Sequence, residues 1–330
     1  MRLRIPLVAA RFLPAQARAT SDLIARVSAM VQRVDELTVE QSTYQFYEYC
    51  QSLCPSQYRR ALEEWYETYS GRALDLDNPK TFCEKLQWLK LYDSTPLKTR
   101  LADKYLVRQW VENRIGVRYL IPILGVWDSF TDIDFAALPN QFILKCTHSS
   151  GFNEIIRDKA SMDLLSVRAR FDQWLHINYA YWQGFELHYS DIRPRILAER
   201  YIINGHGELN DYKVWCFNGV PHFIQYLNHE DDVRHASIFD TNWVLQPFSL
   251  NRPRHIDAIG RPAALPELLR CAAVLSQGLT FVRVDFYITE GGDLKFGEMT
   301  FSPRSGLMFF DPPIFDRVVG DLIDLSSAGH

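Results

Sequence analysis

The sequence predicts an α+β protein with a helical N-terminal extension. Residues 21–71 carry apolar side chains at three- and four-residue steps, and the segment 55–71 begins with proline and ends with glycine. After Gly116 the pattern changes to short β-rich runs, with hairpin dipeptides Asn-Gly at 218–219 and Gly-Gly at 291–292. Helices are therefore expected first, and antiparallel strands later in the chain.

Composition narrows the class of protein. A chain of 330 residues exceeds the usual size of one core, so two or three subdomains around a cleft are expected. The net charge of −4 gives no reason to expect nucleic acid as a partner. Six irregularly spaced cysteines are typical of reduced cytosolic thiols, and no neighbouring Cys/His pair completes a zinc site with Cys50 and Cys54.

The N-terminus bears on localisation. No apolar run approaches the roughly 20 residues of a membrane span. Residues 1–19 faintly imitate a signal peptide, but Arg11 interrupts the apolar stretch. A surface helix or a peripheral membrane contact explains this segment better. We therefore expect a cytoplasmic protein, with peripheral contact at the inner face of the membrane left open.

The remaining elements follow from local signals. Helices are expected at 79–92, capped by Asp77 or Asn78, and from a Ser94 cap to Gly116. The other expected helices span residues 161–178 and 266–279. The expected strands span 119–127, 141–146, 154–158, 195–202, 211–217, 220–227 and 281–289, with a further hairpin at 236–248.

The stretch 281–306 contains the most informative pattern. If residues 291–292 form a tight turn, Asp285 lies directly across from Glu298 and Arg283 across from Thr300. These four side chains then share one face, and apolar residues cover the other. Opposed carboxylates repel across a sheet, so this pair beside an arginine suggests a bound Mg²⁺ with phosphate. A solvated outer face is the alternative.

A second stretch, 141–158, places Lys145 at the end of a buried strand, before the small-residue loop Ser149, Ser150 and Gly151. Backbone N–H groups of such a loop can bind phosphate oxygens, and the lysine adds a point charge. An ordinary hairpin loop with a solvated lysine is equally compatible. No Walker motif is present, and residues 204–210 lack the glycine spacing of a dinucleotide site.

Taken in order, several motifs resemble the ATP-grasp superfamily, and specifically the teichuronopeptide-biosynthesis (TupA-like) ATP-grasp family. The resemblance runs from about Asn78 to Gly306 through NPKTFCEKLQWLKLYD, LADKYLVRQWV, YLIPILGVWDSF, LPNQFILKCTH, DYKVWCFNG and FVRVDFYI…FGEMTFSP. It implies an ATP-grasp fold, in which ATP is held between two antiparallel-sheet subdomains. The first 70 residues lie outside it.

The resemblance also implies site residues. Those implied for ATP are Lys104, Lys145, Ser149, Ser150, Gly151, the hinge residues Glu199, Arg200, Tyr201 and Ile202, then Asp211 for ribose, and Lys213 and Arg283 for phosphate. Those implied for Mg²⁺ are Asp285, Glu298 and Thr300, the last standing where many ATP-grasp enzymes have asparagine. Arg283, Lys145 and Arg304 are the expected catalytic residues. The role of Arg304 follows from its own chemistry: it stands in the turn after the metal-bearing strand, and arginine can bind a substrate carboxylate bidentately. A loop arginine paired with an acid such as Asp311 is the alternative.

The expected domain organisation has four parts. They are a helical N-terminal region at 1–77, the start of the ATP-grasp-like region at 78–140, a small lid subdomain at 141–202 and a large subdomain with the metal and phosphate site at 203–330.

The expected function is an ATP-dependent carboxylate–amine ligase that forms an amide through an acyl phosphate. The family suggests a uronic acid of a cell-surface polysaccharide or its precursor as the carboxylate, and an amino acid or amine as its partner. A glycosyltransferase is the alternative, because Asp75-Leu76-Asp77 and Asp132-Ile133-Asp134 resemble an acidic metal motif, although both fit helix caps. A non-catalytic nucleotide-binding protein is the third hypothesis.

Overall fold

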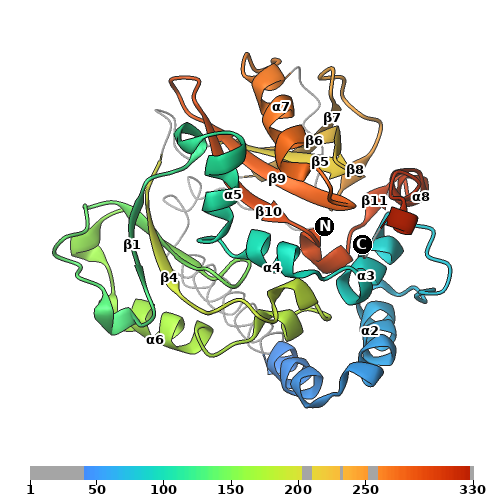
Figure 1. Cartoon of the computed structure of the whole chain (residues 1–330), viewed down its shortest axis with the longest axis horizontal. Helices are drawn as coiled ribbons and strands as arrows, with labels where there is room; N and C mark the ends of the chain where they lie inside the picture. The colour runs from blue at the N-terminus through green and yellow to red at the C-terminus, as the bar shows by residue number, and fades with distance from the viewer. Residues whose placement is uncertain (1–40, 203–209, 231–232, 252–258, 328–330) are drawn as a thin grey trace, which may run out of the picture. The chain divides into compact units, whose positions relative to one another are not determined.

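The computed structural model describes residues 41–202, 210–230, 233–251 and 259–327 (Figure 1). The chain forms two compact units, Met1–Ser52 and Leu53–His330. In the described part of the first unit, residues 41–52 are helical. The predicted helix before residue 41 and the predicted N-terminal membrane contact lie outside the described residues. Both β-sheets and the candidate site belong to the second unit.

The helices of the second unit are α2 (Pro55–Ser70), α3 (Phe82–Tyr92), α4 (Pro96–Ala102), α5 (Val107–Arg114), α6 (Leu164–Trp174), α7 (Leu265–Ser276) and α8 (Ile314–Gly320). As predicted, α2 begins with proline and ends at Gly71, whose φ of 68° suits glycine. The predicted caps were wrong by a few residues. Thr81 caps α3 in a capping box with Glu84, and Thr95 caps α4.

The predicted single helix from residue 94 to 116 is interrupted between α4 and α5. The carboxylate of Asp103 accepts hydrogen bonds from the backbone N–H groups of Tyr105 and Leu106, at 2.7 and 3.1 Å. The N–H of Lys104 leaves the helix and donates to the carbonyl of Thr147 at 3.0 Å. Aspartate competes in this way with helical hydrogen bonding, and the break turns Lys104 toward the small sheet.

The smaller sheet contains β1 (Ile123–Trp127), β4 (Ile196–Arg200), β2 (Phe142–Cys146) and β3 (Asn153–Ile156), all antiparallel and in that spatial order. Along β2 the burial alternates, so Phe142 and Leu144 are in the core while Ile143 and Lys145 are half-buried on the other face. The aromatic contact of Phe130 with Phe171 joins α6 to this subdomain.

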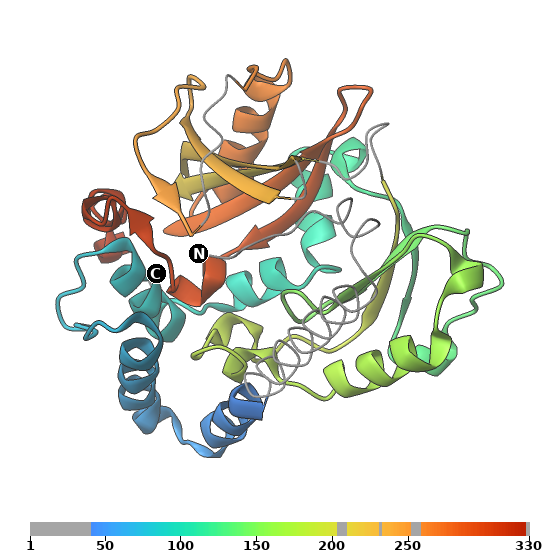
Figure 2. The ribbon, with the colours of Figure 1, turned by 180° about the vertical axis from the view of Figure 1, so that it is seen from behind.

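The larger sheet contains β10 (Leu294–Thr300), β9 (Phe281–Ile288), β5 (Asp211–Phe217), β6 (Val220–Glu230) and β7 (Val233–Asp240), again antiparallel and in that order. Helix α7 covers one face, as Figure 2 shows. On the other face α3 covers one end, where Phe82 stacks on Trp215 with ring centroids 5.1 Å apart. Lys213 of β5 and Arg283 and Asp285 of β9 lie on that same face.

The two predicted hairpin turns differ in outcome. At 218–219 both residues have positive φ, 49° and 78°, so the predicted Asn-Gly turn between β5 and β6 is confirmed. The loop between β9 and β10 is longer than the predicted two-residue turn at 291–292. The N–H of Thr289 donates to the carbonyl of Asp293, so the loop contains the three residues 290–292. The predicted hairpin at 236–248 is reduced to a bridge between Phe239 and Leu245, and β8 (Ser249–Leu250) pairs with β11 (Phe310–Asp311).

A β-bulge alters the predicted register of β9 and β10. Thr300 pairs with Arg283 as predicted, but Phe296 pairs with Phe286, so Gly297 and Glu298 together oppose the single residue Asp285. Glu298 therefore lies across from Asp285 together with Gly297, and not as the direct pair that was predicted. Because the longer loop and the bulge compensate, Glu298 still lies on the face predicted for it.

Candidate active site

The two sheets of the second unit face a common cavity of about 240 Å³. In Figures 1 and 2 helices α4 and α5 also lie between the sheets. The cavity is lined by predicted site residues from both sheets and from the break between α4 and α5: Lys104, Lys145, Ser150, Gly151, Glu199, Lys213, Asp285 and Glu298. The remaining lining residues are Ile143, Asn153, Ile155, Tyr287 and Gly297. Positions far apart in the chain thus share one polar cavity.

Asp285 is the centre of the charges on the larger sheet. It lies opposite Lys213 in the β5–β9 register, and Nζ of Lys213 is 2.6 Å from Oδ2 of Asp285. Arg283, two residues earlier on β9, donates from Nε to Oδ1 and from Nη2 to Oδ2, both at 2.7 Å. Asp285 is only 2% exposed, and two cations compensate its buried charge.

Glu298 is the second carboxylate of this group. Its Oε1 is 3.5 Å from Nη2 of Arg283 and accepts a hydrogen bond from the Thr300 hydroxyl at 3.1 Å. Its Oε2 is 3.5 Å from Nζ of Lys104. Burial acts to raise the pKa of Glu298, but the positive charges of Lys104, Arg283 and Lys213 outweigh it and lower the pKa to about 2. Glu298 is therefore ionised at neutral pH.

Lys104 joins the two sheets. Its Nζ donates to the carbonyl of Ser149 at 2.5 Å in the loop between β2 and β3, and also faces Glu298 on β10. The break between α4 and α5 makes this reach feasible, because the backbone of Lys104 is itself bonded to Thr147. A lysine in the middle of a continuous helix would have no such constraint on its direction.

Lys145 and Glu199 form a second charged group, on the smaller sheet. Nζ of Lys145 is 2.6 Å from Oε2 of Glu199, and Nη1 of Arg108 is 3.0 Å from Oε1. Arg108 is not among the site residues predicted from the sequence. A signal was present, since Arg108 stands four residues after Lys104, but the break between α4 and α5 removes the helical geometry that this spacing would suggest.

The loop between β2 and β3 has the small-residue character that the sequence predicts. Gly151 has a φ of 81°, a backbone conformation that favours glycine. Ser149 is fully buried, and no hydrogen-bond partner is found for its hydroxyl among the described residues. Phe152 anchors the end of the loop by stacking on Trp174 at 5.1 Å. The loop is thus held at its base, with Ser150 and Gly151 exposed toward the cavity.

Of the predicted adenine and ribose residues, Glu199 lines the cavity, whereas Arg200, Tyr201, Ile202 and Asp211 are not among its lining residues. Arg200 is exposed, while Tyr201 and Ile202 are half-buried and followed by residues outside the described ranges. Asp211 lies 3.6 Å from Nζ of Lys213. Burial raises the pKa of Asp211 above its ordinary value, although Lys213 opposes the shift. These assignments remain predictions.

Arg304 is the predicted site residue that the structure sets apart. Its side chain is exposed, is not among the residues that line the cavity, and donates from Nε to the carbonyl of Leu307 at 3.5 Å. Its backbone belongs to the turn that directly follows β10, so the substrate role remains a prediction about that turn.

The number of carboxylates in the cavity bears on the kind of metal that Asp285 and Glu298 could hold. Within the described residues no group of three or more His, Cys, Asp or Glu side chains forms a metal-binding cluster. Asp285 and Glu298 both contact Nη2 of Arg283, so their oxygens face the same small region. Two carboxylates suit Mg²⁺ that takes its other ligands from phosphates and water. The residues therefore fit a metal that arrives with a nucleotide.

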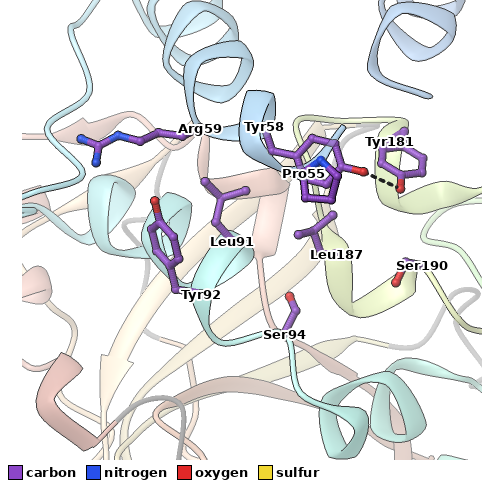
Figure 3. A pocket seen from close by; sticks show the side chains of 9 residues that line it. All are labelled: Pro55, Tyr58, Arg59, Leu91, Tyr92, Ser94, Tyr181, Leu187 and Ser190. Carbon is purple, nitrogen blue, oxygen red and sulfur yellow. Dashed lines mark hydrogen bonds between the residues drawn. The ribbon is translucent and has the colours of Figure 1, made fainter. Parts of the chain in front are cut away.

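A second cavity, of about 390 Å³, is larger but holds none of the predicted site residues. Figure 3 shows its lining from α2, from the end of α3 and from the segment 181–190. The hydroxyls of Tyr58 and Tyr181 meet at 3.1 Å on one side of it. The charged groups described above lie in the smaller cavity, and the chemistry is assigned there.

The two acidic tripeptides have local roles. The Asp75 carboxylate accepts the N–H groups of Asp77 and Asn78, each at 3.0 Å, and Asp77 is held by Arg59. The Asp134 carboxylate accepts the N–H of Ala136 at 3.0 Å. Neither tripeptide lines the cavity.

Two antiparallel sheets that face a shared cavity of lysines and carboxylates define an ATP-grasp protein. The family model described as TupA-like ATPgrasp matches residues 84–324, which is more than half of the chain, and the chain belongs to that family. The family and the α+β fold class predicted from the sequence are confirmed.

The solved structures that match this chain are distant. The D-alanine–D-alanine ligase from Bacillus anthracis, complexed with ATP, has 15% identity over 69% of this chain and 66% of its own, with a TM-score of 0.43. The N5-carboxyaminoimidazole synthetase from Staphylococcus aureus has 14% identity over 61% of this chain and 44% of its own, with a TM-score of 0.35. The chain thus spans 66% of the length of the ligase and 44% of the length of the synthetase. No curated protein matches it.

Proposed function

We propose that this chain is an ATP-dependent carboxylate–amine ligase that forms an amide through an acyl phosphate. The observation that carries the proposal is that Lys104, Lys145 and Lys213 line one cavity together with Asp285 and Glu298, and that Arg283 contacts both of these carboxylates. Four cations at one site suit the phosphates of ATP, and paired carboxylates suit the metal that accompanies them.

Each residue has a role in this proposal. Lys104 and Lys145 bind phosphate oxygens from the side of the smaller sheet, and Lys213 and Arg283 bind them from the larger sheet. The N–H groups of Ser149, Ser150 and Gly151 cover the phosphates. The backbone from Glu199 to Ile202 binds adenine, and Asp211 binds the ribose hydroxyls.

Asp285 and Glu298 would hold Mg²⁺, with Thr300 beside them. When bound with ATP, the metal would supply positive charge to the phosphate oxygens. In the structure these carboxylates instead neutralise Lys104, Lys213 and Arg283. With ATP and Mg²⁺ bound, Lys104, Lys213 and Arg283 would pair with phosphate oxygens, and Asp285 and Glu298 would be free to hold the metal. ATP and Mg²⁺ are therefore expected to bind together much better than either alone.

The reaction then needs two transfers. A carboxylate oxygen of the substrate attacks the γ-phosphorus, the bond to the bridging oxygen breaks, and ADP leaves. The amine nitrogen attacks the acyl carbon and loses a proton to solvent, the carbon–oxygen bond of the mixed anhydride breaks, and inorganic phosphate leaves as the amide forms. The cations stabilise charge as it develops on the transferred phosphate, and the cavity aligns the reactants.

The setting follows from the family. A uronic acid of a cell-surface polysaccharide or its precursor is the proposed carboxylate substrate, and an amino acid or other amine is its partner. The proposed location is the cytoplasm, with peripheral contact at the membrane. Within the described residues, no helix is long and apolar enough to cross a membrane.

The test supplies the protein and Mg²⁺-ATP with pools of uronic acids and amines. Phosphate release that needs both substrates supports the ligase, and an ¹⁸O-labelled carboxylate should transfer one label to the released phosphate. Hydroxylamine should trap the acyl phosphate as a hydroxamate. Release of UDP from a UDP-sugar would instead identify a glycosyltransferase, and ATP binding without turnover would identify a non-catalytic nucleotide-binding protein.

A further inference from the structure

The turn that follows β10 has an unusual backbone. Arg304 and Ser305 have φ angles of 52° and 54°, and Gly306 has 75°, so three consecutive residues are left-handed. Side chains other than glycine disfavour this conformation, and such strain persists only where the surroundings impose it. The turn begins two residues after Thr300, which contacts both Arg283 and Glu298. The turn is therefore a direct continuation of β10, the strand that carries Glu298.

Two buried polar side chains of α3 hold this turn from one side. Nζ of Lys90 donates to the carbonyl and the hydroxyl oxygens of Ser305, at 3.1 and 3.0 Å. Nε2 of Gln87 donates to the same carbonyl at 3.1 Å, and its Oε1 accepts from Lys90 at 2.8 Å. Lys90 is 2% exposed and Gln87 is fully buried.

The segment 183–186 holds the turn from the other side. The Ser305 hydroxyl donates to the carbonyl of Gln183, and the Ser302 hydroxyl donates to the carboxylate of Glu186. At Gly306 the fit against α3 is so close that a Cβ atom would lie 2.2 Å from Nε2 of Gln87. The turn is thus clamped between α3 and the segment 183–186.

Burying an ammonium group is energetically unfavourable, because its charge must be compensated inside the protein. Lys90 is compensated by oxygens of Ser305 and Gln87, and it lies over the Trp65 ring at 4.5 Å. Glu186 feels the charge of Lys90, which lowers its pKa against the stronger effect of burial. These interactions converge on the backbone of one turn, although Lys90 does not line the cavity.

We propose that Lys90 is a positioning residue that, with Gln87, holds the Ser302–Gly306 turn in the left-handed shape that receives the carboxylate substrate. This inference rests on the proposed ligase function and deepens it. Lys90 acts through Ser305 and touches neither nucleotide nor substrate. Removing the Lys90 ammonium group is therefore expected to weaken the binding of the carboxylate substrate and to leave the affinity for the nucleotide unchanged.

The variant is Lys90→Met, which keeps the length of the side chain and removes its charge and donors. The matched control is Lys85→Met on the same helix. Lys85 also donates to backbone carbonyls, but to those of Gly320 and Ile323 at 2.9 and 2.8 Å, away from the turn. Gln87→Met is the second variant should Lys90→Met fail to fold.

The first readout is independent of activity. The exposed Arg304 makes the bond to Ser305 a trypsin site inside the clamped turn. Under native conditions, cleavage there, followed by mass spectrometry, should be at least about tenfold faster in Lys90→Met than in the wild type or Lys85→Met. A cleavage rate equal to that of the control would overturn the clamp.

The second readout is kinetic. Lys90→Met should raise the KM of the carboxylate about tenfold or more, while the Kd of Mg²⁺-ATP stays within about twofold of the wild type. An unchanged carboxylate KM in an active variant, or an equal loss of ATP affinity, would overturn the positioning role. If the wild type forms no amide, the ligase function fails, whatever the variants show. If the wild type forms the amide but the cleavage rate or the carboxylate KM of Lys90→Met equals that of the Lys85→Met control, only the role of Lys90 fails.

Discussion

Arg283 binds both oxygens of the Asp285 carboxylate, from Nε and Nη2, at 2.7 Å each. The two residues stand two positions apart on β9, so the alternation of the strand places them on one face. The same Nη2 reaches Glu298 and Thr300 on β10. One guanidinium thus contacts both carboxylates of the candidate site.

Glu298→Gln should lower turnover by about 100-fold or more, because it removes the charge proposed to hold Mg²⁺ while keeping the shape of the side chain. Turnover is measured across a Mg²⁺ titration, and circular dichroism checks the fold. Glu290→Gln, in the loop of the same hairpin, is the control and should be active. Turnover like that of the wild type at limiting Mg²⁺ would sink the assignment.

Lys104→Ala and Lys145→Ala should each weaken Mg²⁺-ATP binding by about tenfold or more, because each removes one phosphate cation. Stability should change by less than about 1 kcal/mol, since Glu298 keeps Arg283 as a partner and Glu199 keeps Arg108. Isothermal titration calorimetry measures the affinity. The exposed Lys80→Ala is the control, and unfolding of either site variant would indicate a structural role.

Gly297→Ala tests the bulge. An added Cβ would lie 3.1 Å from the Asp285 carbonyl oxygen and 3.1 Å from Cε2 of Tyr287, so the bulge must shift. We expect a stability loss of about 1–3 kcal/mol in urea unfolding and a fall in turnover. For Gly291→Ala the nearest atom is 4.0 Å away, and this control should change stability by less than about 0.5 kcal/mol. Equal effects of the two variants would show that the bulge is not under steric constraint.

Arg304→Lys should raise the KM of the carboxylate or lower kcat by about tenfold or more, because lysine cannot reproduce a bidentate contact. The affinity for ATP should stay near that of the wild type. Arg317→Lys, an exposed arginine on α8, is the control. A loss of ATP affinity, or unchanged acceptor kinetics, would place Arg304 in the nucleotide site or in the scaffold.

Glu186 should make stability depend on pH. Burial raises its pKa to about 7, although Lys90 and the bond from Ser302 oppose the shift. The folded state therefore keeps this proton to higher pH than the unfolded state. The stability that protonated Glu186 contributes to the folded state is full below pH 4.5 and is lost as the pH rises to 7. Relative to the wild type, Glu186→Gln should gain up to about 3 kcal/mol between pH 5 and pH 8. Urea unfolding across this range measures it, and a difference that does not change with pH would refute the prediction.

Sequence patterns predicted the parts of the fold that depend on local chemistry. Proline at 55 and glycine at 71 delimit α2 because each suits one end of a helix. The Asn-Gly pair at 218–219 forms its turn because both residues tolerate positive φ. Alternation placed Arg283, Asp285 and Thr300 on one face. The family was likewise readable from spaced motifs.

By itself, then, the sequence determined the fold class and the family, and it predicted the lysines and carboxylates that line a common cavity. Only the tertiary structure decided how they meet. Four features depend on contacts between residues that are distant in the chain. They are the bulge at Gly297, the direction of Lys104 after the helix break, the pairing of Arg108 with Glu199, and the hydrogen bonds from Lys90 to Ser305. Such contacts are set by packing between elements, and a periodic pattern records only which face of an element is buried.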